Sequence, residues 1–268
     1  MRKYFDPTQR RLIYVDSNAT PTFWDQCWAA DASLRERLMA TRHTRVSRVT
    51  EQYLRPSDGI ILEGGCGPGE MVASLAHSGY SVIGVDTAEK TVELLRQCVP
   101  ELDIRYGDVR NLEFADGYFA GYWSIGVIEH FWDGYEAIAS EMSRVLRPGG
   151  YLFLTFPYMS PVRIVRGRVG LFARWRPGMS HDGFYQFALD SASVIDHFHR
   201  IGFRLVKSMP FDFINGSEDL APMAKPVLRS LFGRTQGGLC VKVLRKTVAW
   251  ALSPLACHCQ LLVLNKTR

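Results

Sequence analysis

Short hydrophobic runs alternate with helix-length amphipathic runs between residues 58 and 157. The hydrophobic runs predict strands over 59–63, 81–86, 103–107, 119–125 and 151–156. Between them, apolar positions recur every three or four residues, which predicts helices over 70–77, 88–98 and 134–146. Strands that alternate with helices are typical of a parallel sheet joined by crossover helices. The sequence therefore predicts a doubly wound α/β fold.

This alternation is interrupted twice after residue 157. It stops over about 158–183 and resumes with a strand at 184–188, a helix at 192–201 and a strand at 203–208. It stops again over about 210–254, which includes a basic amphipathic helix candidate at 240–252, and a last strand is predicted at 259–264. We interpret both interruptions as insertions in one domain, residues 58–268. Residues 1–57 contain an aromatic cluster at 23–28 and a long helix candidate at 31–53, and predict an N-terminal helical cap.

The strongest chemical signal is the turn after the first strand of this alternation. The strand ends at Glu63, and the turn contains Gly65, Cys66, Gly67 and Gly69. Glycines let the backbone approach a ligand at the carboxyl edge of a parallel sheet, where doubly wound folds bind their ligands. Glu70 stands where a dinucleotide fingerprint needs its third glycine, and no Gly-Lys-Ser/Thr follows. The turn therefore argues against NAD and against a P-loop nucleotide.

The turn resembles the first motif of the class I S-adenosylmethionine-dependent methyltransferases, and similarity continues in register over about 58–157. Asp86 ends the second strand, where this family binds both ribose hydroxyls, and Asp108 matches the acid that accepts from the adenine amino group. The resemblance implies a Rossmann-like sheet of seven mostly parallel strands, the last antiparallel, with helical insertions. It implies S-adenosyl-L-methionine as the cofactor, bound by Glu63, Gly65, Cys66, Gly67, Gly69, Asp86, Thr87, Asp108, Val109, Ser124 and Ile125.

Each of these acids has a structural alternative. Taken singly, Asp86 and Asp108 are also explained as solvated carboxylates at strand ends or as helix caps. Cys66 is also explained as a small residue that fills the turn. The acids and the glycine turn occur in the family's order, which favours cofactor binding over coincidence.

His130 is the candidate catalytic base, because it follows the fourth strand at the edge where cofactor and acceptor should meet. An imidazole has an unperturbed pKa of about 6.5, which suits proton transfer at neutral pH. The alternative, that His130 and Glu129 orient the loop, stays open. Glu129 and Tyr185 are the candidate substrate contacts, although a packed strand also explains Tyr185. Gly126 replaces an acid that the similar quinone-pathway O-methyltransferases carry, so no metal site is predicted on their pattern.

Composition adds limits on the class of protein. The chain has 268 residues, 47% of them hydrophobic and 22% charged, which is typical of a globular protein with a sizeable core. No run is long and apolar enough to span a membrane, and residues 1–6 lack a signal-peptide core. Cys257 and Cys259 flank His258 with no second ligand pair nearby, so zinc is not predicted. These features favour a cytoplasmic protein.

Charge is unevenly distributed along the chain. Residues 1–160 carry a net charge of −5 and residues 161–268 a net charge of +10. Five arginines lie in the first insertion, Arg163, Arg166, Arg168, Arg174 and Arg176. A solvated surface explains them, and so does an anionic or lipid-linked acceptor or peripheral contact with the inner face of a membrane.

The function predicted from these features is methyl transfer to an oxygen or nitrogen of a small molecule by in-line displacement. Nucleic acid is disfavoured as a substrate, because the fourth strand lacks the (Asp/Asn)-Pro-Pro-(Tyr/Phe) turn that holds a flipped base. The alternative is a cofactor-binding fold that acts as a membrane-docking or partner-docking module through its basic C-terminal third. The oligomeric state stays open.

Overall fold

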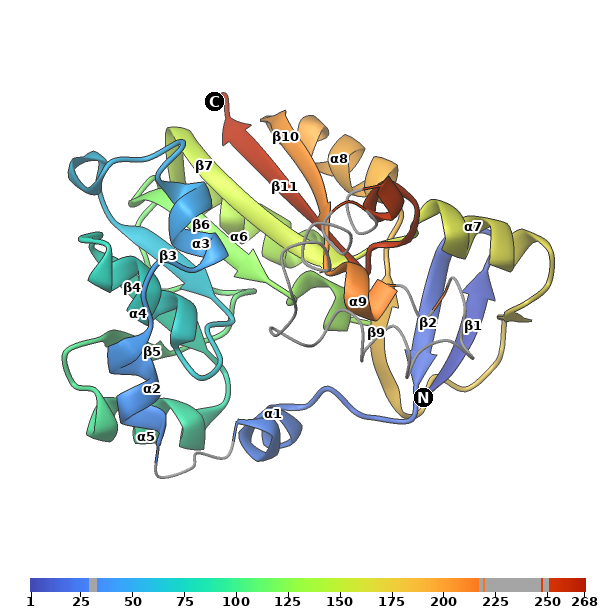
Figure 1. Ribbon diagram of the computed structural model, residues 1–268, viewed down its shortest axis with the longest axis horizontal. Coiled ribbons are helices and arrows are strands. Elements are labelled where there is room, and N and C mark those ends of the chain that lie inside the picture. The colour runs from blue at the N-terminus through green and yellow to red at the C-terminus, as the bar shows by residue number, and fades with distance from the viewer. Residues whose placement is uncertain (29–32, 217–218, 220–246, 248–250) are drawn as a thin grey trace. The chain divides into compact units, whose positions relative to one another are not determined.

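The computed structural model describes residues 1–28, 33–216, 219, 247 and 251–268 (Figure 1). These residues belong to two compact units. Unit 1 comprises the described parts of 1–17, 156–194 and 208–261, and unit 2 comprises those of 18–155, 195–207 and 262–268. Some strands continue from one unit into the other, and each unit is described by itself below.

A seven-stranded sheet has the strand order β10-β11-β7-β6-β3-β4-β5. Its strands are β3 (Ile61–Gly64), β4 (Val82–Asp86), β5 (Asp103–Tyr106), β6 (Phe119–Ile125), β7 (Leu146–Pro157), β10 (Phe203–Phe211) and β11 (Cys259–Lys266). The five strands from β7 to β5 are parallel. β11 is antiparallel to β7, because Asn265 bonds the carbonyl of Gly149 while Tyr158 bonds that of His258. The predicted mostly parallel fold with an antiparallel last strand is confirmed.

The centre of this sheet is buried on both faces. Every residue of β3 and β4 is buried, which explains why both sequences are hydrophobic without alternation. β3 lies between β4 and β6, with Glu63 opposite Gly84 on one side and Trp123 on the other. Because these strands are parallel, their carboxyl ends meet at one edge of the sheet.

Four helices of unit 2 lie close to their predicted bounds. They are α4 (Glu70–His77), α5 (Glu89–Cys98), α6 (Glu136–Val145) and α8 (Ser191–Arg200), the last of which begins in unit 1. On one face of the sheet, the Trp123 indole N–H donates to Thr50 Oγ1 at 2.9 Å. Its neighbour Tyr122 points to the opposite face, toward Glu141 of α6, as the two-residue period of a strand requires.

The expectation of one long helix over 31–53 is wrong. Two short helices, α2 (Leu34–Ala40) and α3 (Arg45–Thr50), occupy this segment, and residues 31–32 lie outside the described part. Thr44 accepts a hydrogen bond from the Ser47 N–H and begins α3 as its N-cap. Thr44 is a typical N-cap residue and marks the start of a new helix. The spacing of apolar residues over 31–53 does not show this break.

Unit 1 contains a four-stranded sheet with the order β8-β1-β2-β9. Its strands are β1 (Arg2–Asp6), β2 (Arg11–Val15), β8 (Ala173–Arg174) and β9 (Phe184–Ala188). The expected helical N-terminal cap is wrong for residues 2–15, which form a hairpin. Asp6 ends β1 and its carboxylate accepts the N–H groups of Thr8 and Gln9, which closes the turn. β9 has its predicted bounds, and its partner is β2.

The insertions contribute α7 (Pro161–Arg168) and α9 (Phe213–Gly216) to unit 1. Arg163 begins the five-arginine run but is 1% exposed, so the expected solvated surface is wrong at this position. Its guanidinium donates to Asp219 at 2.6 Å, to the Tyr158 carbonyl at 2.8 Å and to His258 Nδ1 at 2.6 Å. Burial, together with Arg163, lowers the pKa of His258 to about 4. The helix predicted over 240–252 lies largely outside the described residues.

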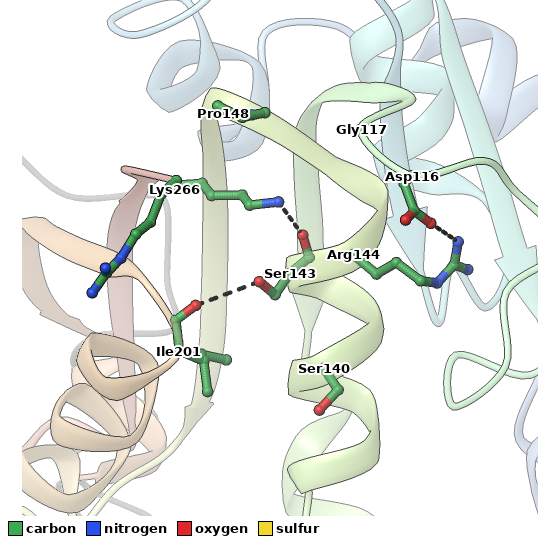
Figure 2. A pocket seen from close by; sticks show the side chains of 9 residues that line it. Asp116, Gly117, Ser140, Ser143, Arg144, Pro148, Ile201 and Lys266 are labelled. Atoms are coloured by element: carbon green, nitrogen blue, oxygen red, sulfur yellow. Dashed lines mark hydrogen bonds and ion pairs between the residues drawn. The ribbon is translucent and has the colours of Figure 1, made fainter.

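A lysine near the C-terminus fastens β11 to α6 in unit 2. The Lys266 ammonium donates to the carbonyls of Ser143 and Leu146, the latter at 2.8 Å. Lys266 is one of the residues that line a cavity of about 540 Å³. Figure 2 shows its side chain reaching toward Ser143, whose hydroxyl faces the Ile201 carbonyl. Lys266 thus satisfies two of the carbonyls that the last turn of α6 leaves without helical partners.

Replacing Lys266 with Met should lower the free energy of unfolding by about 1 to 2 kcal/mol, because two carbonyls lose a charged donor. Urea denaturation of the full chain measures this change. Lys207→Met, which alters an exposed lysine of β10, is the matched control and should change stability by less than about 0.5 kcal/mol. Equal effects of the two substitutions would show that the contact with α6 contributes no stability.

Candidate functional site

A cavity of about 370 Å³ lies in unit 2 at the carboxyl ends of β3, β4 and β6. This is the edge where doubly wound sheets bind ligands. Eight of the predicted site residues line the cavity: Gly65, Gly67, Asp86, Thr87, Asp108, Val109, Ile125 and His130. The structure therefore gathers around one cavity residues that lie up to 65 positions apart in the sequence.

The glycine turn fits its surroundings only without side chains. Gly65 has a φ of +77°, and a Cβ there would lie 2.4 Å from Val127 Cγ2. Gly67 has a φ of +47°, and a Cβ there would lie 3.2 Å from the Trp28 ring. Both conformations and both contacts exclude larger residues, so the turn presents bare backbone to the cavity.

Asp86 holds this turn against the end of β4. One carboxylate oxygen accepts the Gly67 N–H at 2.8 Å and the other accepts the Ala88 N–H at 2.9 Å. The side chain is buried, and burial raises the pKa of Asp86 although these N–H groups oppose the shift. The carboxylate thus organises the turn while it lines the cavity.

Asp108 lies on the same wall and is paired with an arginine that the sequence argument did not single out. Arg110 donates to both carboxylate oxygens of Asp108, at 2.6 to 3.0 Å, and lies over the Phe131 ring at 5.3 Å. The hydrogen bond from Arg110 lowers the pKa of Asp108 below its usual range. Asp108 is therefore a carboxylate at neutral pH.

Two tryptophans of the aromatic cluster, Trp24 of α1 (Pro21–Cys27) and its C-cap Trp28, line the cavity, and Trp28 lies beside Gly67 of the glycine turn. Trp24 stacks on Trp28 with ring centroids 5.7 Å apart, and its edge meets the His130 ring at 4.9 Å. Asp25 fixes the helix from its other side, because its carboxylate accepts both the N–H and the hydroxyl of Thr91 at 3.0 Å. α1 is thereby tied to α5 beside the cavity.

Five predicted site residues do not line the cavity: Glu63, Cys66, Gly69, Ser124 and Glu129. Gly69 caps α4 with a φ of +77°, and the other four are buried. Desolvation raises the pKa of Glu63 well above its usual range and raises that of Glu129 to about 8. Glu129 is thus largely uncharged at pH 7, and each glutamate has one carboxyl oxygen without a hydrogen-bond partner within the described structure.

Tyr185 belongs to unit 1, where it packs against a core that includes Phe5, Tyr14 and Met159. Its proposed contact with substrate stays a prediction. Sequence reasoning missed several lining residues, namely Ala19, Thr20, Pro21, Gly107, Arg110, Gly126, Val127, Phe131 and Trp132. Thr20 and Pro21 carry an N-cap signal that marks the start of α1, whereas nothing local marks Arg110.

The cavity fits the cofactor that the resemblance implies. Its wall carries the carboxylates of Asp86 and Asp108 but only one arginine, Arg110, so its charge suits a cationic ligand better than a diphosphate. Bare backbone at residues 65–67 admits close approach, and the aromatic rings of Trp24, Trp28, Phe131 and Trp132 supply apolar surface. A sulfonium compound with a nucleoside and an amino-acid part matches this combination of carboxylates, bare backbone and aromatic rings.

Comparison with known sequences gives the same assignment. Residues 62–154 match the family model described as "Methyltransferase domain". A probable S-adenosylmethionine-dependent methyltransferase of Mycolicibacterium smegmatis is 39% identical over 97 residues, 36% of this chain and 37% of that protein. A ubiquinone biosynthesis O-methyltransferase of Xanthomonas axonopodis pv. citri is 29% identical over 161 residues, 58% of this chain and 66% of that protein. The chain thus matches less than two thirds of the length of either relative.

Solved structures share the fold at low sequence identity. A SAM-dependent methyltransferase from Archaeoglobus fulgidus superposes with a TM-score of 0.55 at 17% identity, over 91% of this chain and 99% of that one. The [4+2]-cyclase SpnF superposes with a TM-score of 0.54 at 16% identity, over 94% and 99% of the two chains. Residues 62–154 thus match a methyltransferase domain by sequence, and the fold of the chain is that of solved S-adenosylmethionine-dependent methyltransferases. The cavity fits the cofactor of those proteins, S-adenosyl-L-methionine.

Proposed function

We propose that the chain transfers the methyl group of S-adenosyl-L-methionine to an oxygen or nitrogen atom of a small molecule. The observation that carries this proposal is that Asp86, Asp108, the glycine turn and His130 line one cavity. An O-methyltransferase among the relatives supports an oxygen acceptor. The fold alone does not decide the reaction, because it is shared with a protein described as a cyclase.

The bound cofactor would supply a methyl group on a cationic sulfur, whose leaving group is neutral. The chain's own residues then have three tasks, which are to hold the cofactor, to align the acceptor and to take its proton. Asp86 and the backbone of Gly65 and Gly67 would hold one side of the cofactor. The rings of Trp24 and Trp28 cover the turn and limit the access of water. Alignment of this kind accounts for a large part of the rate of a displacement reaction.

We place His130 at the acceptor, as the residue that takes its proton. It is the imidazole on the cavity wall, and its ring is positioned by the edge contact with Trp24. Glu129 precedes it in the chain, is buried, and has a pKa of about 8. An uncharged carboxyl at this position supports the loop as a hydrogen-bonding group, and it does not stabilise an imidazolium by charge. Because Glu129 is buried and does not line the cavity, its contact with substrate stays a prediction.

Replacing Asp86 with Ala should weaken S-adenosylmethionine binding by about 1.5 to 3 kcal/mol, because charged hydrogen bonds to the ribose are lost. Isothermal titration calorimetry measures the affinity. Stability should also fall, by about 1 to 2 kcal/mol, since the Gly67 and Ala88 N–H groups lose their acceptor. Asp103→Ala, at an exposed carboxylate of β5, is the control and should bind normally. Normal affinity in the Asp86 variant would remove this residue from the site.

Replacing His130 with Gln should lower the rate of methyl transfer by about 10²- to 10⁴-fold, the usual contribution of a positioned base. S-adenosylmethionine affinity should change less than about twofold. The rate is followed as S-adenosylhomocysteine formed with a fractionated small-molecule extract as the acceptor source. His199→Gln, at an exposed histidine of α8, serves as the control. A variant of His130 with the parent's rate at every pH from 6 to 9 would rule out proton transfer by this residue.

Replacing Glu129 with Gln should change how stability depends on pH. Its carboxyl has a pKa of about 8 in the folded chain and an ordinary value of 4.5 when unfolded. Between those values the folded state keeps a proton that the unfolded state has lost. Because of this carboxyl, the free energy of unfolding falls as the pH rises, by up to about 1.4 kcal/mol per pH unit. Urea denaturation at pH 5, 6, 7 and 8 should give a shallower decline for the Gln variant, and identical slopes would contradict the buried, uncharged state.

A further inference from the structure

Three exposed aliphatic side chains gather on one short segment of unit 1. Val165, Val169 and Leu171 are 58%, 64% and 60% exposed. Val165 and Val169 are four residues apart, and the Val169 N–H bonds the Val165 carbonyl at 3.0 Å, so both lie on one face at the end of α7. The Leu171 N–H donates to the Arg166 carbonyl at 2.9 Å, so Leu171 also lies at the C-terminal end of α7.

Three exposed arginines that have no carboxylate partner in the described part of the chain lie close to these aliphatic residues in the sequence. Arg168, Arg174 and Arg176 are exposed, and within the described residues none of them is within 4.0 Å of a carboxylate oxygen. The segment 142–181 contains no Asp or Glu at all. Arg163 behaves differently, because it is buried and paired with Asp219. Three of the five arginines of the insertion are therefore available for an external anion.

We propose that residues 165–176 dock on the surface of an acidic lipid bilayer. In this arrangement Val165, Val169 and Leu171 enter the interfacial layer, and Arg168, Arg174 and Arg176 lie beside anionic headgroups. Aliphatic side chains next to basic ones are typical of segments that bind at a bilayer interface. The contact is peripheral, since no helix within the described ranges has the length and hydrophobicity to cross a bilayer.

A bilayer fits this surface better than a protein partner does. A stable protein interface buries about 800 Å² on each side and centres on large anchors such as Trp or Tyr. The exposed cluster consists of two valines and one leucine, and its three arginines have no fixed geometry from ion pairs. Such a patch suits a fluid anionic surface, which requires area and charge but no shape complementarity. This inference goes beyond the proposed methyl transfer and does not rest on it.

The test is sedimentation of the full chain with vesicles of phosphatidylcholine, with and without 30% phosphatidylglycerol. The chain should bind the acidic vesicles and remain in the supernatant with the neutral ones. Binding should weaken when salt is raised from about 0.1 M to 1 M, because the Debye length falls from about 10 Å to about 3 Å. Replacing Arg168, Arg174 and Arg176 with Gln should reduce binding by roughly a hundredfold.

A second pair of variants separates the apolar contribution from charge. The double variant Val165→Ser and Val169→Ser should lower binding by at least about fivefold at unchanged net charge. The matched controls are Leu205→Ser with Val206→Ser, and Arg200→Gln with Arg204→Gln and Lys207→Gln, all at exposed positions of α8 and β10. These controls should bind like the parent, and every variant should keep its S-adenosylmethionine affinity.

The outcomes decide the proposal in either direction. It is supported if acidic vesicles bind the parent and both controls alike and bind each patch variant more weakly by the factors given above. It is overturned if the parent stays in the supernatant with acidic vesicles, if neutral vesicles bind equally, or if the patch variants bind like the parent. In the first of these cases an acidic protein surface becomes the occupant to examine.

Discussion

The site depends on one buried carboxylate, that of Asp86, and on the two backbone N–H groups that it accepts. Burying a carboxylate is costly unless hydrogen bonds compensate, and here the Gly67 and Ala88 N–H groups provide them. These bonds join the end of β4 to the turn that follows β3. The turn can approach so closely because Gly65 and Gly67 have positive φ values and no side chains. The bare backbone that lines the cavity and part of the cavity's negative charge follow from this arrangement.

The sequence predicted the central sheet well, because the signals there are local. Strands β3, β4 and β6 are hydrophobic runs between helices whose ends carry Gly or Pro, and α4 has the bounds that its apolar period predicted. The cavity-lining residues among the predicted set follow strand ends, and parallel strands bring their ends to one edge. Glu63 and Glu129 fit the same motifs but are buried behind the wall, which a motif does not reveal.

The features that the sequence did not predict depend on contacts between distant segments. β2 pairs with β9, about 175 residues later, and no local pattern in either strand indicates the partner. Arg163 and Arg168 lie in the same arginine-rich run, yet Arg163 is buried because Asp219 lies 56 residues further on. Asp25 and Thr91 are 66 residues apart, and their hydrogen bonds tie the aromatic cluster of α1 to α5. The sequence around Arg163 and Arg168 gives no sign that one arginine is buried and the other exposed.

The central claim is that this cavity binds a cationic sulfonium cofactor and that the chain uses it. Titration calorimetry of the full chain with S-adenosylmethionine, and in parallel with NAD⁺, tests the charge argument directly, and chromatography of the same samples shows whether S-adenosylhomocysteine forms. The account predicts one site for S-adenosylmethionine, no measurable binding of NAD⁺, and product formation that rises when an acceptor extract is added. Binding of NAD⁺ in preference to S-adenosylmethionine, or binding of neither, would contradict it.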